Sequence, residues 1–270
     1  MLHEVLPDGP GPLPPFAISR SNLRRILQDF TARGYGPGTL DDVVYGWDQR
    51  PSHAGGQDRQ GRTGLPGRRL VLTFDDGTCD FIDHALPVLE ELGFTATLFI
   101  VAGKVGGKRD WSALPGQPPL APVPLMDAVM LRQLRDRGFT IGSHTMSHPV
   151  LPATGDEQAQ EEIARSKQVL ADMLGQPVRW FAYPYLAATG QTQELVRLAG
   201  YEGACGGANR THQRYYLNRI DATLYSLPQL RLRCNGLFHI TRQLVRQLRY
   251  RHTTGTPQAI SMRANHAGSG

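Results

Sequence analysis

The chain has 270 residues, of which 40% are hydrophobic and 20% charged, and its formal net charge is +5. This composition is typical of a soluble globular protein, and the length is enough for one large α/β domain or two small ones. No stretch approaches the roughly 18 consecutive apolar residues of a membrane-spanning helix, and three scattered cysteines argue against a disulfide framework.

Predicted strands and helices alternate along most of the chain. From the N-terminus, the hydrophobic pattern predicts a strand over 2–5, helices over 19–34 and 39–45, a strand over 70–74, a helix over 80–92, a strand over 95–101, a helix over 126–137, a strand over 139–142, a helix over 157–174, a strand over 178–181, a helix over 193–199, strands over 201–205 and 215–220, and helices over 227–232 and 237–251. Strand, helix and strand in this order predict parallel βαβ units and an α/β fold.

Two irregular segments interrupt this alternation. Residues 49–67 are rich in glycine, proline, glutamine and arginine without periodicity, which predicts a surface loop. Residues 103–124 contain five prolines and Trp111, and irregular segments of this length inside a compact domain are often functional. We therefore expect the second segment to shape a substrate cleft.

The strand over 70–74 ends abruptly in Asp75, Asp76 and Gly77. Aspartate is a poor strand residue, and burying a carboxylate is costly unless it is paired, hydrogen-bonded or bound to a metal. An Asp-Gly pair also suits an ordinary turn, so the motif alone leaves a simple chain reversal open. Two carboxylates in succession at a buried strand end nevertheless call for a partner.

Two further polar clusters follow predicted strands. His144 and His148 are spaced so that both imidazoles can reach one ion, and Tyr183 and Tyr185 follow the strand over 178–181. The carboxyl ends of parallel strands meet at one edge of a barrel or sheet, and this edge carries the active site. One carboxylate and two imidazoles form a mixed oxygen and nitrogen site suited to a divalent ion such as zinc. The spare carboxylate is then a candidate general base.

At Thr73-Phe74-Asp75-Asp76-Gly77 and His144-Thr145-Met146-Ser147-His148 the chain resembles the polysaccharide deacetylases, the NodB-homology or carbohydrate esterase 4 family. The resemblance extends over about residues 3–232. It implies a distorted (β/α) barrel with one divalent metal ion, which we expect to be Zn²⁺, and hydrolytic removal of acetyl groups from N- or O-acetylated sugars. The resemblance makes Asp75 the base, and Asp76, His144 and His148 the metal ligands.

The segment Phe181-Ala182-Tyr183-Pro184-Tyr185 is similar to the third motif of this family. The resemblance implies that the backbone N–H of Tyr185 helps to hold the oxyanion of the reaction. We expect Tyr183 and Pro184 to bind the substrate, together with Trp111 of the irregular segment.

The same segment also departs from the family pattern. Many members carry an arginine that orients the base at the position where Ala182 stands here. Arg179 lies three residues upstream on a predicted strand, so its side chain is expected on the opposite face. Leu186 stands where a glycine usually follows the motif, which is a second departure from the family pattern.

The sequence does not assign the catalytic acid. The late Leu-x-His motif of the family has its literal match at Leu237-Phe238-His239, in a basic, helix-like stretch beyond the expected barrel, which favours a chance match. His212 and His3 are the other histidines that could serve.

The C-terminal part of the chain is strongly basic, with ten arginines and a single acidic residue, Asp221, after Cys205. A solvated basic face is the favoured interpretation. We assign residues 1–235 to the deacetylase-like domain, including an N-terminal helical and loop segment over 14–68. Residues 236–252 are assigned to a basic helix and residues 253–270 to a disordered tail.

An acetylated carbohydrate is the expected partner, and no nucleic acid is expected. The basic helix is compatible with weak association with an anionic membrane surface, although a helix that docks on the barrel is preferred. The alternative functions are a catalytically impaired carbohydrate-binding relative and a membrane-surface-associated protein acting on lipid-linked sugars. The first residues lack the basic start and apolar core of a signal peptide, which predicts a cytoplasmic protein.

Overall fold

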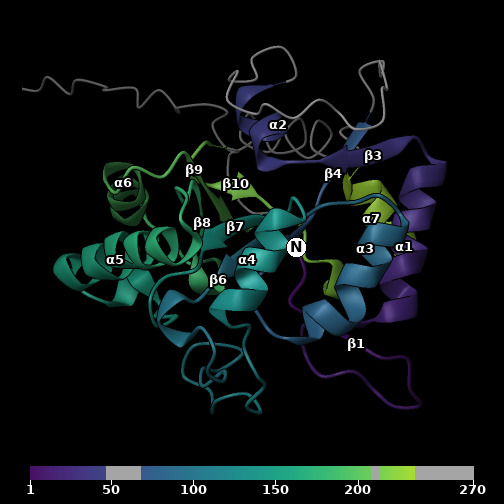
Figure 1. Cartoon of the computed structure of the whole chain (residues 1–270), viewed down its shortest axis with the longest axis horizontal. Helices are drawn as coiled ribbons and strands as arrows, with labels where there is room; N and C mark the ends of the chain where they lie inside the picture. The colour runs from purple at the N-terminus through teal and green to yellow at the C-terminus, as the bar shows by residue number, and fades with distance from the viewer. Residues whose placement is uncertain (47–67, 208–212, 235–270) are drawn as a thin grey trace, which may run out of the picture. The chain divides into compact units, whose positions relative to one another are not determined.

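The structure is a computed structural model that describes residues 1–46, 68–207 and 213–234 (Figure 1). The chain divides into two compact units, Met1–Leu227 and Pro228–Gly270. The elements described below belong to the first unit, except that the short helix α7 (Leu227–Cys234) extends into the second. The predicted loop over 49–67, the basic helix over 236–252 and the tail over 253–270 lie outside the described residues.

A curled sheet of six parallel strands forms the centre of the first unit, in the order β10-β9-β8-β7-β6-β5 (Figure 1). Neighbouring strands pair in parallel throughout, which confirms the βαβ units predicted from the sequence. The strands are β5 (Thr73–Phe74), β6 (Thr97–Ile100), β7 (Thr140–Ser143), β8 (Trp180–Ala182), β9 (Gly203–Gly206) and β10 (Leu217–Asn218).

Helices connect successive strands from β5 to β9 and bury one apolar face each. In α4, for example, Leu131 and Leu134 are buried, and Asp127 begins the helix by accepting the N–H groups of Val129 and Met130. The connecting helices are the π-helix η1 (Phe81–Ala85) with α3 (Leu86–Glu91), then α4 (Ala128–Asp136), α5 (Asp156–Leu174) and α6 (Gly190–Leu198). Single-turn elements are η2 (Ala102–Lys104), η3 (Leu151–Ala153), η4 (Pro184–Leu186) and η5 (Ala222–Leu224). Together with the curled sheet, these helices form the predicted distorted (β/α) barrel.

The N-terminal segment lies between the two edges of the curled sheet. At the β5 edge, the carbonyl of Leu2 accepts the N–H of Asp75 at 3.0 Å. At the other edge, just after β10, the nitrogen of Met1 donates to the carbonyl of Ile220 at 2.9 Å. The segment therefore bridges the two edges of the sheet, and it places His3 beside the carboxyl end of β5.

The elements before β5 combine predicted and unpredicted features. The helices predicted over 19–34 and 39–45 are confirmed, but the predicted strand over 70–74 is divided between two sheets. Its first half pairs with β3, and Thr73 and Phe74 form β5. The elements are β1 (Glu4–Leu6), β2 (Ala17–Ser19), α1 (Arg20–Ala32), β3 (Tyr35–Gly38), α2 (Leu40–Tyr45) and β4 (Arg68–Val71), with β1 pairing with β2 and β3 with β4.

One core cluster fills the space between β6, β8, β9, β10 and α2. Alternate strand residues supply its side chains because successive residues of a strand point to opposite faces. The cluster contains Phe99, Trp180, Ala182, Cys205 and Leu217 of the strands, with Leu40 of α2. Apolar side chains therefore occupy this side of the sheet. The polar side chains lie at the carboxyl ends of the strands.

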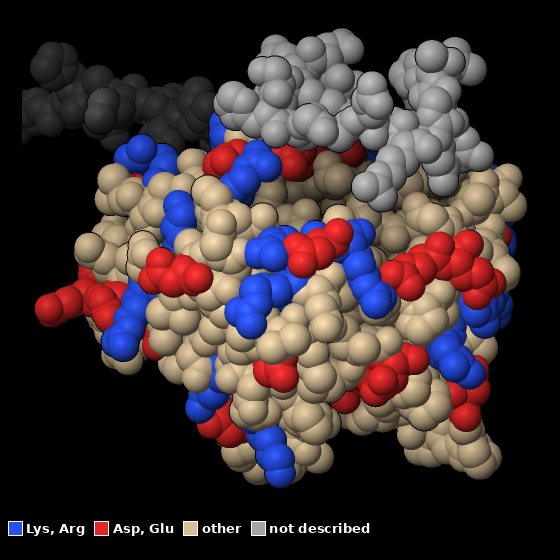
Figure 2. Space-filling view, viewed as in Figure 1, with Lys and Arg blue, Asp and Glu red and all other residues tan. Residues whose placement is uncertain are grey.

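Charges of both signs are mixed on the face of the molecule drawn in Figure 2, where the described Lys and Arg side chains alternate with Asp and Glu. An extended basic patch is the surface feature that favours nucleic-acid binding. The part of that face that the structure describes carries no extended patch of either sign. Among the described helices, none is both long and apolar enough to cross a membrane.

Candidate active site

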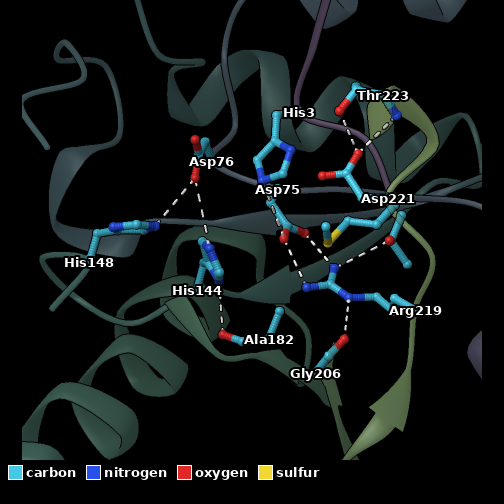
Figure 3. Close-up of polar contacts among 12 residues, drawn as sticks. His3, Asp75, Asp76, His144, His148, Ala182, Gly206, Arg219, Asp221 and Thr223 are labelled. Atoms are coloured by element: carbon cyan, nitrogen blue, oxygen red, sulfur yellow. Dashed lines mark hydrogen bonds and ion pairs between the residues drawn. The ribbon is translucent and has the colours of Figure 1, made fainter. Parts of the chain in front are cut away.

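Three side chains predicted to bind metal come together at the carboxyl edge of the sheet (Figure 3). One carboxylate oxygen of Asp76 lies 3.8 Å from Nε2 of His144 and 3.5 Å from Nε2 of His148. The three candidate ligand atoms all lie within 4.8 Å of one another, and all three side chains are buried. Asp76 follows β5 and His144 follows β7, so the strand ends bring together residues that are far apart in the sequence.

The backbone at these residues is held in an unusual conformation. Asp76, Thr145 and His148 have φ angles of 74°, 70° and 64°, in the left-handed region that residues other than glycine rarely adopt. Each such residue costs of order 1–3 kcal/mol and persists only where surrounding contacts determine the conformation, which is common at functional sites. The surroundings of these three residues must therefore hold the site in shape.

The donor set fits a divalent cation. The buried Oδ1 of Asp76 has no hydrogen-bond partner among the described residues, and burial raises the pKa of this carboxyl. Burial lowers the pKa of His144, and that of His148 well below its ordinary value, so both imidazoles are neutral and able to act as ligands. His144 donates its Nδ1–H to the carbonyl of Ala182 at 2.8 Å, which leaves Nε2 free on the side of Asp76.

Two aromatic side chains pack against the second histidine. The Trp111 ring stacks on the imidazole of His148, with centroids 4.7 Å apart and an interplanar angle of 19°, and the Tyr185 ring meets it edge-on at 4.7 Å. Trp111 is buried with Val101 and Leu125, so the insertion that carries it forms a wall of the candidate metal site. The prediction that Trp111 also contacts substrate stays a prediction.

The other aspartate of the pair, Asp75, makes a separate set of contacts. Arg219 donates to both of its carboxylate oxygens, at 2.6 and 2.9 Å, and both side chains are buried. Burial by itself would raise the pKa of Asp75, but the Arg219 guanidinium, helped by His144 and His3, lowers it well below its ordinary value. Asp75 is therefore ionised at any physiological pH.

Arg219 is a functional candidate that the sequence analysis missed. It directly follows β10 and also donates to Oγ1 of Thr73 at 3.2 Å and to the carbonyl of Gly206 at 3.3 Å. The signal in the sequence is its position near the end of the predicted strand over 215–220, because the other candidate site residues also follow strands. Arg179 lies just before β8, outside the strand, and pairs with Asp41 and Glu202.

Of the three histidines considered for the catalytic acid, only His3 is among the described residues, since His212 and His239 lie outside them. Its Nε2 lies 4.0 Å from a carboxylate oxygen of Asp75, and its side chain is 19% exposed (Figure 3). The imidazole also packs against the ring of Phe16 at 5.2 Å. His3 is thus next to the candidate base and remains in contact with solvent.

The turn of the third motif is strained and braced. Tyr185 and Leu186 both have a φ of 56°, and the hydroxyl of Tyr216 donates to the carbonyl of Leu186 at 3.1 Å. Tyr183 and Pro184 are buried. The Tyr183 hydroxyl donates to the carbonyl of Tyr215 at 2.9 Å, so its side chain helps to fix the turn. Direct substrate contacts of Tyr183 and Pro184 stay predictions.

Comparison with known proteins identifies a family and a set of similar structures. Residues 62–204, more than half of the chain, match the family model described as "Polysaccharide deacetylase". The protein YxkH of Bacillus subtilis (strain 168), whose name places it among these deacetylases, is 28% identical over 160 residues, covering 57% of this chain and 52% of its own. A chitooligosaccharide deacetylase of Rhizobium leguminosarum bv. trifolii is 28% identical over 108 residues, covering 40% of this chain and 41% of that protein. The chain thus spans about half or less of the length of these relatives.

Solved structures resemble a larger part of the chain. IcaB from Ammonifex degensii superposes with a TM-score of 0.64 at 26% sequence identity, covering 84% of this chain and 92% of that one. A de-N-acetylase from Aggregatibacter actinomycetemcomitans has the same TM-score at 16% identity, covering 84% and 96%, and this likeness concerns the fold alone.

Proposed function

Because this chain belongs to the polysaccharide deacetylase family, we propose that it is a metal-dependent hydrolase that removes acetyl groups from an N-acetylated sugar, polysaccharide or glycoconjugate. The observation that carries the proposal is the convergence of Asp76, His144 and His148 beside a second carboxylate, Asp75, that Arg219 keeps ionised. Hydrolysis of an acetamide is promoted by a Lewis acid that polarises the acetyl carbonyl and by a base that takes a proton from water. The three candidate ligands would hold a metal ion as the Lewis acid, and Asp75 is the proposed base.

Asp76, His144 and His148 would hold the metal ion through one carboxylate oxygen and two imidazole nitrogens. When bound, a divalent ion such as Zn²⁺ lowers the pKa of a water molecule and polarises the acetyl carbonyl. The hydrogen bond from His144 to the carbonyl of Ala182 fixes the tautomer and the ring orientation that this ligand set requires.

Asp75 acts as the general base in this proposal. Arg219 holds both oxygens of the carboxylate and keeps it ionised, while each oxygen retains a lone pair that can accept the proton of the attacking water. The backbone N–H of Tyr185 donates to the oxyanion that develops on the acetyl carbonyl, from a turn that Tyr216 braces.

His3 is the proposed catalytic acid, which protonates the leaving amine. Its Nε2 lies 4.0 Å from a carboxylate oxygen of Asp75, so the proposed acid and the proposed base are neighbours. The contacts of the N-terminal segment with β5 and with the chain after β10 hold the imidazole there, although His3 and Asp75 are 72 positions apart in the sequence.

Replacing His3 with glutamine is expected to lower kcat for an N-acetylated sugar by about 10²-fold or more, because the amine leaves poorly without a proton. Hydrolysis of 4-nitrophenyl acetate, whose leaving group needs no proton, is expected to fall by no more than about threefold. Both rates are measured on His3→Gln protein with its metal content determined. Equal losses on the two substrates would contradict the role of His3 as the acid.

Removal of the metal is expected to abolish acetate release, and addition of one equivalent of Zn²⁺ to restore it. The test uses purified protein, a strong chelator followed by reloading, and a panel of N-acetylglucosamine oligomers and O-acetylated polysaccharides, with free acetate as the readout. Asp76→Ala protein, which lacks the carboxylate ligand, serves as the control that reloading cannot rescue. Full activity after complete metal removal would contradict the proposal.

The same panel tests the first alternative, a catalytically impaired carbohydrate-binding relative. That alternative depended on a missing arginine and a missing acid, and Arg219 supplies a guanidinium to Asp75. Binding of metal and oligosaccharide without any acetate release would support it. The membrane-surface alternative depends on residues 236–252, which lie outside the described part of the chain.

A further inference from the structure

Helix α5 places a buried carboxylate against the loop that joins the two candidate ligand histidines. One oxygen of Glu162 accepts the backbone N–H groups of Met146 and Ser147, at 2.8 and 2.9 Å. The other oxygen accepts the hydroxyl of Ser147 at 2.6 Å. A single side chain therefore binds the two residues that immediately precede His148.

The carbonyl groups of the same loop are hydrogen-bonded to η2, the single turn that follows β6. The N–H groups of Ala102 and Gly103 donate to the carbonyls of Thr145 and Met146, each at 2.9 Å. A Cβ on Gly103 would lie 2.6 Å from the Met146 carbonyl oxygen, so only glycine permits this approach. The backbone of the loop is thus hydrogen-bonded on both sides. Glu162 accepts its N–H groups, and η2 donates to its carbonyls.

These hydrogen bonds from Glu162 and η2 explain how the loop keeps its strained backbone. Thr145 and His148 both have positive φ angles, and His148 also donates its N–H to Oγ1 of Thr145 at 3.0 Å. Strained residues of this kind persist only where other contacts hold them. A carboxylate is a costly group to bury for this purpose, but its bonds to N–H and O–H donors are about twice as strong as those between neutral groups.

We propose that Glu162 is a positioning residue of the metal centre, which sets metal affinity without touching the ion. By holding Met146 and Ser147, it keeps the imidazole of His148 within reach of Asp76 and His144 before the ion arrives. The inference rests on the proposed function, because it takes these three residues as the metal ligands. The resulting preorganisation is expected to appear in the affinity for the ion itself.

The test compares Glu162→Ala, Glu162→Gln and Glu161→Ala with the wild-type protein. Glu161 is the neighbouring residue on the same helix, but its side chain is 65% exposed and pairs with Arg165, so it is a matched control. The dissociation constant for Zn²⁺ is measured by competition with a chromophoric chelator. The visible spectrum of the Co²⁺-loaded protein reports the coordination geometry. Thermal unfolding of the metal-free proteins reports stability alone.

Glu162→Ala is expected to weaken Zn²⁺ binding by about tenfold or more and to change the Co²⁺ spectrum, as loss of other outer contacts of metal ligands does. Glu162→Gln is expected to stay within about threefold of wild type, because an amide oxygen still accepts the two N–H bonds and the NH₂ group can donate to Ser147. Glu161→Ala is expected to bind Zn²⁺ as the wild type does.

Unchanged Zn²⁺ affinity in Glu162→Ala, with or without a lower melting temperature, would overturn the positioning role and leave the proposed function intact. Absence of Zn²⁺ binding by the wild-type protein would overturn the proposed function and this inference with it. If Glu162→Ala does not fold, Ser147→Ala decides, since it removes one of the three bonds. Its Zn²⁺ affinity is expected to fall by about threefold, and wild-type affinity there would overturn the role.

Discussion

Replacing Asp75 with asparagine is expected to lower kcat for acetate release by about 10³-fold while leaving the metal bound. An amide of the same size has no basic lone pair with which to take a proton from water. The three candidate metal ligands are untouched by the substitution, because Asp75 contacts Arg219 rather than the ligand cluster. Acetate release and metal content are measured on the same protein sample.

Stability has to be controlled in this experiment. In Asp75→Asn the buried guanidinium of Arg219 loses its counter-charge, so the variant is expected to unfold more readily. The double variant Asp75→Asn with Arg219→Met removes both charges and restores a neutral interior. If either variant, with full metal occupancy, retains more than about a tenth of wild-type kcat, Asp75 is not the base.

Arg219→Met is expected to destabilise the protein by about 3–5 kcal/mol at neutral pH, because it leaves the buried carboxylate of Asp75 without a partner. Activity at neutral pH is also expected to fall, since the guanidinium no longer opposes the effect of burial, which raises the pKa of Asp75 and favours the protonated carboxyl. The stability and activity of Arg219→Lys are expected to lie between those of the wild type and of Arg219→Met. An ammonium keeps the positive charge but cannot donate to both oxygens of Asp75 in the geometry of a guanidinium.

The stability lost in Arg219→Met is expected to depend on pH in a definite direction. In the wild type the pKa of Asp75 is lower in the folded chain than in the unfolded chain. The ion pair therefore contributes its full stability above the unfolded pKa and loses it as pH falls towards the folded value. In Arg219→Met the folded pKa is expected to lie above the unfolded one, which favours folding at acid pH.

The difference in melting temperature between wild type and Arg219→Met is accordingly expected to be largest at neutral pH and to shrink below about pH 4. Thermal unfolding of the metal-free proteins across this range measures it. Arg165→Met is the matched control, since Arg165 is 63% exposed and its pair with Glu161 is expected to contribute less than about 1 kcal/mol. A Tm difference that is independent of pH would contradict the assignment of the effect to Asp75.

The candidate metal ligands could be predicted because local rules govern their positions. A buried apolar run predicts a strand, parallel strands share an edge, and polar residues at the carboxyl ends meet there. Asp76, His144 and His148 satisfy these rules, and the structure brings them together. The predicted strand over 70–74 shows the limit of the same rules, because an apolar run does not reveal that the chain changes sheets at Leu72.

The partners of Asp75, the proposed base, could not be predicted in this way. Arg219 is 144 residues from Asp75 and His3 is on the N-terminal segment, and no periodicity relates them to the motif. An arginine in a basic stretch has the same local pattern whether it is solvated or buried against a carboxylate. The choice between the two depends on where β10 lies relative to β5.

By itself, the sequence determined the alternation of strands and helices and the placing of the acidic and histidine motifs at strand ends, because these depend on residues close together in the chain. Only the tertiary structure decided which arginine faces Asp75, which histidine stands beside it, and that Glu162 grips the loop before His148. Those contacts arise from closure of the curled sheet and from packing of α5 against it, and such long-range packing is a property of the folded chain as a whole.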